Sequence, residues 1–279
     1  MRSKKLNEIL WRNFARFLLI VVTIIYVLPF YWMFSTSLKA DNELFEMPPK
    51  WFPIPPHWEN YPRALNFFPF WRYFLNSVII TVGSVIGTLV ASPLVAYGFS
   101  KINWPGRDVW FIIMLSTMML PFAVTMIPTF VIFQKLGMVN TFWPLILPSF
   151  TGVPMHIFLI RQFFNSIPDD LIDAARVDGA TEFQIYRKIM LPLSKPVLLL
   201  VALFQFLASW NNYLGPLIYL TDESKYPLAL GLPQFINRYG TYWNVMMAAA
   251  TMAVIPSIVF FFFAQKYLIE GIKLSGLKE

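Results

Sequence analysis

The apolar stretch at residues 74–100 reads FLNSVIITVGSVIGTLVASPLVAYGFS and contains no Asp, Glu, Lys or Arg. About 20 apolar residues in a helix are enough to cross the hydrocarbon core of a bilayer. The whole chain agrees with this reading, because 57% of its 279 residues are hydrophobic and only 13% are charged. Soluble domains carry roughly a quarter charged residues. The sequence therefore predicts a membrane protein.

Working outward from this stretch, we predict six membrane-spanning helices, none of which contains an acidic or basic residue other than histidine. Their approximate bounds are 17–37, 74–100, 109–134, 142–160, 197–220 and 243–265. The predicted fold is an all-α polytopic membrane protein. A single six-helix transmembrane domain occupies 1–279, with a polar cytoplasmic loop at 166–192 and an extracytoplasmic loop at 221–241.

The distribution of basic residues predicts the orientation. Lys and Arg are enriched on the cytoplasmic side of membrane proteins. With both termini placed in the cytoplasm, most of the 22 Lys and Arg residues fall on that side. The first segment also resembles a signal peptide, but it lacks a small-residue cleavage site, so we interpret it as a retained helix. The expected location is the cytoplasmic (inner) membrane of a bacterium or archaeon.

Two of the predicted helices carry special features. Gly83 and Gly87 stand four residues apart in a GxxxG pattern, which lets another helix approach closely. The approaching helix belongs either to a second subunit or to the same chain. Pro121 and Pro128 interrupt the third segment, and each removes a helical hydrogen bond. They indicate either a bent helix beside a water-filled path or ordinary kinked packing.

The loop at 166–192 is polar between apolar neighbours and holds a third of the 15 acidic residues, namely Asp169, Asp170, Asp173, Asp178 and Glu182. We expect a first short helix with Ser166 as its N-cap and an end near Gly179. Thr181 and Gln184 form a capping-box pattern that opens a second helix, which should stop before Pro192. The apolar residues of the two helices can line one side of the loop for docking: Leu171, Ile172, Ala174, Ala175, Phe183, Ile185 and Ile189.

This helical pair has two other interpretations. It is also typical of an amphipathic hairpin that rests on the membrane surface. A DNA-binding helix-turn-helix is disfavoured, because the second helix offers only Arg187 and Lys188 to phosphates and the loop is acidic. We expect no nucleic-acid partner.

Several chemistries are excluded or disfavoured by composition. There is no cysteine and only two histidines, so we predict neither a disulfide nor a metal site. No phosphate-binding GxxxxGK[ST] motif is present, and no intramembrane catalytic constellation is evident, so no catalytic residue is assigned. An ion-coupled carrier usually needs a charged group in the bilayer. Only His156 could serve, and a histidine hydrogen-bonded to a neighbouring helix is the alternative.

The residues of the acidic loop carry a resemblance. Asp173-Ala-Ala-Arg-Val-Asp-Gly-Ala180, followed by Ile189-Met-Leu-Pro-Leu-Ser-Lys-Pro196, resembles the EAA motif of ABC-importer permease subunits. In that family this loop is the coupling helix that contacts a separate ATPase. The first motif position is Asp173 here, where the family usually has Glu. The resemblance implies that ATPase coupling is carried by Asp173, Ala174, Ala175, Asp178, Gly179, Ala180, Leu191 and Pro192.

Further motifs extend the resemblance over nearly the whole chain and indicate the carbohydrate-importer branch, close to the shorter maltose-type permease partner. These motifs are Trp58-Glu-Asn-Tyr61, Phe74-Leu-Asn-Ser77, Ala96-Tyr97, Pro105-Gly-Arg107, Trp210-Asn-Asn-Tyr213 and Gln265-Lys-Tyr-Leu-Ile-Glu-Gly271. The last residues, Ser275-Gly-Leu-Lys-Glu279, depart from the family's usual tail. The resemblance implies a second homologous permease, two ABC ATPase subunits and an extracytoplasmic solute-binding protein as partners. ATP and Mg²⁺ would bind the ATPase rather than this chain.

Two further sets of residues are candidates for contact with the solute or its carrier. Polar residues inside the predicted helices can line a path for a sugar-like solute or can instead join helices by hydrogen bonds: Asn76, Ser77, Thr81, Gln205, Trp210, Asn211 and Asn212. The loop 221–241 resembles the family's loop that probes the binding protein, with Asn237, Arg238 and Tyr239 near its tip. Its other interpretation is a simple connector. The functional alternative to an importer subunit is a secondary carrier or channel for small polar solutes.

Overall fold

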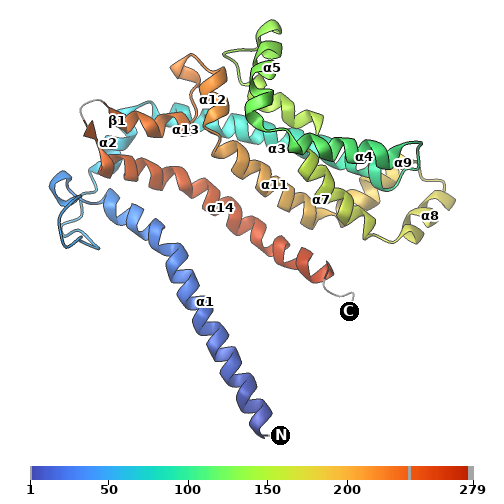
Figure 1. Ribbon diagram of the computed structural model, residues 1–279, viewed down its shortest axis with the longest axis horizontal. Coiled ribbons are helices and arrows are strands. Elements are labelled where there is room, and N and C mark those ends of the chain that lie inside the picture. The colour runs from blue at the N-terminus through green and yellow to red at the C-terminus, as the bar shows by residue number, and fades with distance from the viewer. Residues whose placement is uncertain (1, 238–239, 276–279) are drawn as a thin grey trace. The chain divides into compact units, whose positions relative to one another are not determined.

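The computed structural model describes residues 2–237 and 240–275 and is almost entirely helical (Figure 1). The chain divides into two compact units, one made of the chain up to residue 70 together with 232–254, the other of 71–231 together with the chain from 255 onward. The predicted all-α membrane fold is confirmed. Four helices of the described residues are long and apolar enough to cross a membrane, and up to six if two bent pairs each count as one.

The first unit is built on the N-terminal helix. Its elements are α1 (Arg2–Ser37), η1 (Asp41–Glu43), α2 (Asn60–Phe67), η6 (Leu232–Phe235), the hairpin strands β1 (Ile236–Asn237) and β2 (Gly240–Thr241), and the first part of α14 (Trp243–Ser275). Two buried asparagines hold the end of α1, since Asn60 and Asn244 each donate through Nδ2 to the carbonyl of Lys39 at 3.0 Å. Asn60 also donates to the carbonyl of Ser37.

The second unit contains most of α3 (Phe70–Ser100), the longest helix that crosses it. The remaining elements are α4 (Arg107–Ser116), η2 (Thr117–Met119), α5 (Phe122–Lys135), α6 (Trp143–Ile146), η3 (Leu147–Thr151), α7 (Pro154–Asn165), α8 (Asp169–Val177), α9 (Glu182–Ile185), the π-turn η4 (Tyr186–Met190), α10 (Leu191–Leu193), α11 (Lys195–Trp210), α12 (Leu214–Tyr219), η5 (Glu223–Lys225) and α13 (Leu228–Gly231). Helix α7 contacts both α4 and α11.

Three predicted spans are interrupted rather than continuous. The 109–134 segment breaks after Leu120 and bends by 100° between α4–η2 and α5, because the residue before Pro121 takes an extended conformation. The 142–160 segment begins as α6 and η3 and becomes a regular helix only at Pro154, after Gly152 at φ +87°. The 197–220 segment ends its helix at Trp210, and α12 follows as a separate short helix.

One face of α3 carries a row of buried hydroxyls that hold these irregular segments. Ser84 Oγ donates to the carbonyl of Leu145 at 3.2 Å, and Ser92 Oγ accepts from the backbone N–H of Val153 at 3.4 Å. Irregular backbone at membrane depth is tolerated only where protein or water satisfies its polar groups. The row on α3 therefore explains how the chain at 145–153 departs from helix.

The GxxxG pattern on α3 packs within the chain. A Cβ added at Gly87 would lie 2.5 Å from Cδ2 of Phe150, and one at Gly83 would lie 3.0 Å from Cδ1 of Ile146. The distance at Gly87 is shorter than real Cβ atoms show, and the distance at Gly83 is tighter than nine in ten real Cβ contacts. Of the two interpretations of this pattern, close packing against another segment of the same chain is the one that the structure shows.

We predict that Gly87→Ala lowers the thermal unfolding midpoint of the purified protein in detergent, because the new methyl group displaces the Phe150 ring. Gly98→Ala on the same helix is the matched control. A Cβ there meets no described atom within 4 Å, and alanine favours a helix over glycine by about 1 kcal/mol. Equal shifts for the two variants would contradict the close packing at Gly87.

Candidate functional site

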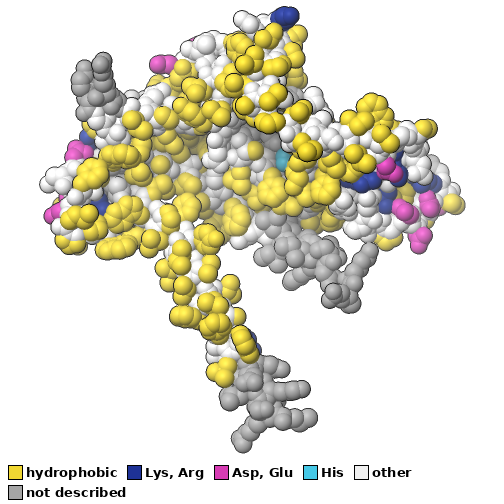
Figure 2. Space-filling model, in the orientation of Figure 1, with side chains coloured by type: hydrophobic (Ala, Val, Ile, Leu, Met, Phe, Trp, Pro, Cys, Tyr) yellow, Lys and Arg dark blue, Asp and Glu magenta, His cyan; other side chains and the backbone are white. Residues whose placement is uncertain are grey.

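The acidic loop folds as a helical hairpin, formed by α8 and α9 with the turn between them, which we call the acidic hairpin (169–185). Charged side chains gather over it in Figure 2, at the end of the second unit where Figure 1 labels α8 and α9. Gly179 lies in the turn at φ +81°, a region that glycine adopts without a steric penalty. Thr181 and Gln184 form the predicted capping box. These two local predictions are confirmed.

The ends of both helices differ from the prediction. Ser166 does not cap α8. It is the C-cap residue of α7, and its hydroxyl donates back to the carbonyl of Phe163. Helix α8 begins only at Asp169, two residues later than predicted, because Pro168 before it takes an extended conformation. The second helix does not stop before Pro192 but continues through η4 and α10 to Leu193. Proline is tolerated there because it stands in the first turn of α10.

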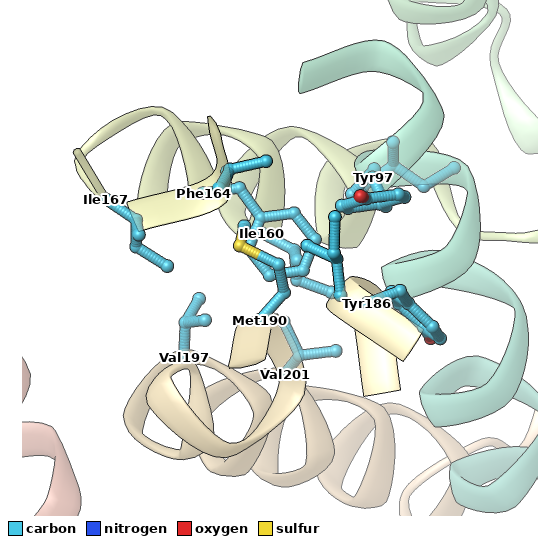
Figure 3. Close-up of a cluster of buried hydrophobic side chains, with 12 residues drawn as sticks. Tyr97, Ile160, Phe164, Ile167, Tyr186, Met190, Val197 and Val201 are labelled. Carbon is cyan, nitrogen blue, oxygen red and sulfur yellow. The ribbon is translucent and has the colours of Figure 1, made fainter. Parts of the chain in front are cut away.

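The hairpin is anchored by a buried apolar cluster that joins four parts of the second unit (Figure 3). From α3, α7 and the connection after it, the cluster includes Ala96, Tyr97, Ile157, Ile160, Phe164 and Ile167. From α8, α9, η4 and α11 it includes Ile172, Ile185, Tyr186, Met190, Val197 and Val201. Ile172 and Ile185, which we expected on a docking surface, are 1% and 0% exposed and face this core. The base of the hairpin is thus fixed by burial of apolar surface.

Three of the five acids of the loop are bound by basic residues of the same chain. Asp169 pairs with Lys101 at 2.6 Å, while Asp173 and Glu182 both pair with Arg176, at 2.9 and 2.8 Å. Within the part of the chain that the structure describes, Asp170 and Asp178 have no ion pair. Lys101 and Arg176 therefore offset part of the negative charge of the cluster, and Asp170 and Asp178 are the acids that remain without an ion pair among the described residues.

The residues assigned to ATPase coupling fall into two groups. Asp173, Ala174, Asp178 and Gly179 are exposed on the hairpin, and Pro192 is exposed on α10. Partly buried members, which pack against the apolar cluster, are Ala175, Ala180 and Leu191. The turn of the hairpin is thus presented outward, while its flanks rest on the core.

Several candidates for the solute path have partners within the chain. Asn76, 8% exposed, donates through Nδ2 to the carbonyls of Ser224 and Tyr226, and Ser77 Oγ accepts from the N–H of Leu228. Gln205 donates to Ser209 Oγ at 3.0 Å and Ser149 Oγ at 3.4 Å. Apart from the Gln205–Ser209 bond within α11, these contacts join a helix to another segment, which is the structural alternative to lining a solute path.

The other path candidates differ in exposure. Thr81 is 1% exposed, and its hydroxyl has no partner among the described residues. Trp210 is 6% exposed and stacks on Phe206, with ring centroids 5.6 Å apart. Asn211 is exposed and Asn212 half-buried, where α11 ends. Asn211 and Asn212 are thus the two candidates nearest a free surface.

The loop 221–241 is shaped by short helical turns and the β1–β2 hairpin rather than by one helix. Asn140, at φ 62°, accepts the N–H groups of Thr221 and Asp222 through Oδ1, so the start of the loop is fixed to the turn before α6. Asn237 lies in β1. The other predicted binding-protein contacts, Arg238 and Tyr239, lie outside the described residues.

His156 lies in the first turn of α7 and is 6% exposed. Its Nδ1 has no hydrogen-bond partner in the described part of the chain. No group of three or more His, Asp or Glu side chains there could hold a metal ion. His156 is therefore not part of an ion-binding cluster of such side chains within the described residues.

A broken-helix membrane fold with an outward-presented helical hairpin is the architecture of a transporter permease subunit. The family model of the binding-protein-dependent transport system inner membrane component matches residues 83–274, and the chain belongs to this family. It is therefore a membrane-spanning subunit of an ABC importer. It is a transport subunit rather than an enzyme, with the ATPase on a partner.

Named relatives and a solved structure agree. The chain is 38% identical over 209 residues to the arabinooligosaccharides transport system permease protein AraQ of Halalkalibacterium halodurans, which covers 75% of each chain. It is 32% identical to AraQ of Bacillus subtilis, with 92% of each chain covered. A bacterial ABC transporter involved in the import of the acidic polysaccharide alginate matches with a TM-score of 0.80 and 28% identity, over 93% of this chain and 96% of that one.

Sequence reasoning missed the groups that attach the hairpin, namely Tyr97, Lys101, Arg176 and Glu182. Glu182 accepts from Arg176 and from Tyr97, 85 positions earlier in the chain. The sequence offered one signal for ion pairs there. Acids are concentrated in the loop, and Lys101 and Arg107 lie on the same predicted side of the membrane. The pairing itself depends on the approach of α3 to the hairpin.

We predict that the bond between Glu182 and Tyr97, one of the polar ties between the hairpin and α3, weakens in acid. The hydrogen bond from Arg176, followed by that from Tyr97, holds the pKa of Glu182 below its ordinary 4.5. A carboxylate with a lowered pKa stabilises the folded state above the unfolded-state value and loses this effect as pH falls through the lowered value. Amide hydrogen exchange of 182–186, corrected for intrinsic rates, should therefore stay slow from pH 8 to 5 and accelerate below about pH 4.

The control for this experiment is Glu182→Gln, which has no carboxylate to titrate. Its exchange should be faster than in the unmodified protein at neutral pH and should lack the acid step. An identical acid step in the variant would assign the transition to another group.

Proposed function

We propose that this chain forms half of the translocation path for a sugar or sugar-like solute and couples to a separate ATPase through the loop 166–192. The observation that carries the proposal is the acidic hairpin, whose turn at Asp178-Gly179 is exposed while its base is buried in the core. An exposed turn whose base is packed in the core can transmit a displacement imposed by a partner subunit. The relatives named for arabinooligosaccharide transport and the alginate importer support a hydroxyl-rich solute.

The proposed assembly contains a second homologous permease, two ABC ATPase subunits that bind ATP and Mg²⁺, and an extracytoplasmic binding protein that delivers the solute. The N- and C-termini and the hairpin face the cytoplasm, by the distribution of Lys and Arg. Closure of the ATPases around ATP displaces the hairpins, and the helices move between inward- and outward-open states.

Within the proposed path, Asn211 and Asn212 are the favoured contacts for the solute. Both lie where α11 ends, and side-chain amides bind sugar hydroxyls as donor and acceptor together. Asn76, Ser77, Thr81, Gln205 and Trp210 are buried in the single chain, and we assign them to shaping the wall of the path.

We expect Gly179→Pro and Asp173→Lys to reduce solute uptake by at least about tenfold in proteoliposomes of the whole transporter, while membrane insertion persists. Proline fixes φ near −65°, which is incompatible with the +81° of Gly179. Lysine at 173 reverses the charge that pairs with Arg176. Asp170→Lys, at an exposed acid without an ion pair, controls for the change of charge. Uptake at the unmodified rate in both variants would refute coupling through the hairpin.

The loop 221–241 should face outside and contact the binding protein during turnover. Because the chain has no cysteine, Asn237→Cys provides a single labelling site. It should react with an impermeant maleimide added outside and become protected when the loaded binding protein docks. Reaction only from the cytoplasmic side would overturn the proposed orientation, and unprotected outside reaction would make the loop a connector.

A further inference from the structure

A relay of hydrogen bonds joins the end of α3 to the acidic hairpin. The hydroxyl of Tyr97, a residue 3% exposed, donates to Oε2 of Glu182 at 2.5 Å. Arg176 Nε donates to the other carboxylate oxygen, Oε1, at 2.8 Å, and Arg176 Nη1 donates to Asp173 at 2.9 Å. The carboxylate of Glu182 therefore bridges the two helices of the hairpin and ties both to α3.

A second tie lies at the beginning of the hairpin. Lys101 follows the last residue of α3, and its side chain is 4% exposed. Its Nζ donates to Asp169 at 2.6 Å and to the carbonyl of Ile167 at 2.9 Å. Arg176 Nη2 also donates to the carbonyl of Lys101 at 3.3 Å. The chain near Tyr97 and Lys101 is thus bonded to the start of α8, to its end and to α9.

These contacts differ from isolated surface ion pairs, which contribute little. The side chains of Tyr97 and Lys101 are buried, so their donor groups are held in one orientation. The charged groups of Lys101, Asp169, Arg176, Asp173 and Glu182 lie in one network. Apolar packing, such as that between Tyr97 and Tyr186 with ring centroids 5.4 Å apart, resists separation but is not directional. Hydrogen bonds to a carboxylate fix direction as well as distance.

Along the chain the hairpin is connected to α7 on one side and, through a 78° bend, to α11 on the other. Helix α3 has no such covalent neighbour in the hairpin. Motion of the hairpin therefore reaches α3 only through side-chain contacts, and the relay supplies the directional ones.

We propose that Tyr97, Glu182 and Arg176, together with Lys101 and Asp169, are positioning residues that latch the acidic hairpin to α3. The latch makes the hairpin and the end of α3 move as one body, so that a displacement imposed on the turn is delivered to α3 as well as to α11. This inference rests on the proposed function, in which the turn receives a push from an ATPase.

The test compares two tyrosines of the same buried cluster (Figure 3). Tyr97→Phe removes the hydroxyl that bonds Glu182 and keeps the ring. Tyr186→Phe is the matched control, because the Tyr186 hydroxyl makes no hydrogen bond within the described residues. Each variant is assembled with its partner permease, ATPases and binding protein in proteoliposomes. The measured quantity is the number of ATP molecules hydrolysed per solute molecule imported.

For Tyr97→Phe we expect this ratio to rise by about tenfold or more, the order given by loss of one hydrogen bond to a charged group. Assembly and ATP binding should be unchanged, and Tyr186→Phe should keep the unmodified ratio. Glu182→Gln tests the same bond from the acceptor side, since it removes the carboxylate at a partly exposed side chain. The double variant Tyr97→Phe/Glu182→Gln should be no worse than the more severe single variant, since both break one relay.

The outcomes separate the latch from the proposed function. An unchanged ratio in both Tyr97→Phe and Glu182→Gln overturns the latch, as does an equal change in Tyr97→Phe and Tyr186→Phe, which would reflect packing alone. Gly179→Pro is measured in the same preparation. If Gly179→Pro abolishes uptake and Tyr97→Phe has no effect, the latch fails and coupling stands; if neither has an effect, coupling through the hairpin fails as well.

Discussion

The structure depends on the need of every backbone polar group at membrane depth to find a partner within the protein. Helix α3 meets this need for its neighbours. Ser84 and Ser92 bind the backbone of the irregular segment between α6 and α7, and Asn76 binds the carbonyls of the chain around η5. Because α3 satisfies its own backbone, its side chains are free to satisfy others. The irregular segments at 145–153 and around η5 thus find partners for these backbone groups on α3.

The same helix also carries polar residues near both of its ends, where they contact the two proposed functional regions. Near its start, Asn76 and Ser77 hold the beginning of the 221–241 loop, which we propose to contact a binding protein. Near its end, Tyr97 and Lys101 hold the acidic hairpin. A helix that is bonded near both ends to loops for which we propose different partners would connect those partners mechanically.

Local features were predictable from sequence, and features that depend on long-range approach were not. The glycine at 179 and the Thr181 capping box follow from nearest neighbours in the chain, and both are observed. The side of the hairpin that Ile172 and Ile185 occupy is set by the distant residues of α3, α7 and α11, so composition alone assigned them wrongly to an exposed surface. The bend after Leu120 had a sequence signal in Pro121, but the 100° angle is set by tertiary packing.

The acidic residues of the loop show why a cluster of charge is ambiguous. Asp169, Asp173 and Glu182 are bound by Lys101 and Arg176, so they stabilise the hairpin rather than present it to a partner. An exposed surface remains around the turn, with Val177 88% and Phe183 63% exposed. Such apolar exposure on a rigid base is typical of a docking surface. Recognition by an ATPase would then depend on shape and apolar contact at the turn. The acids would fix the orientation of the hairpin relative to α3.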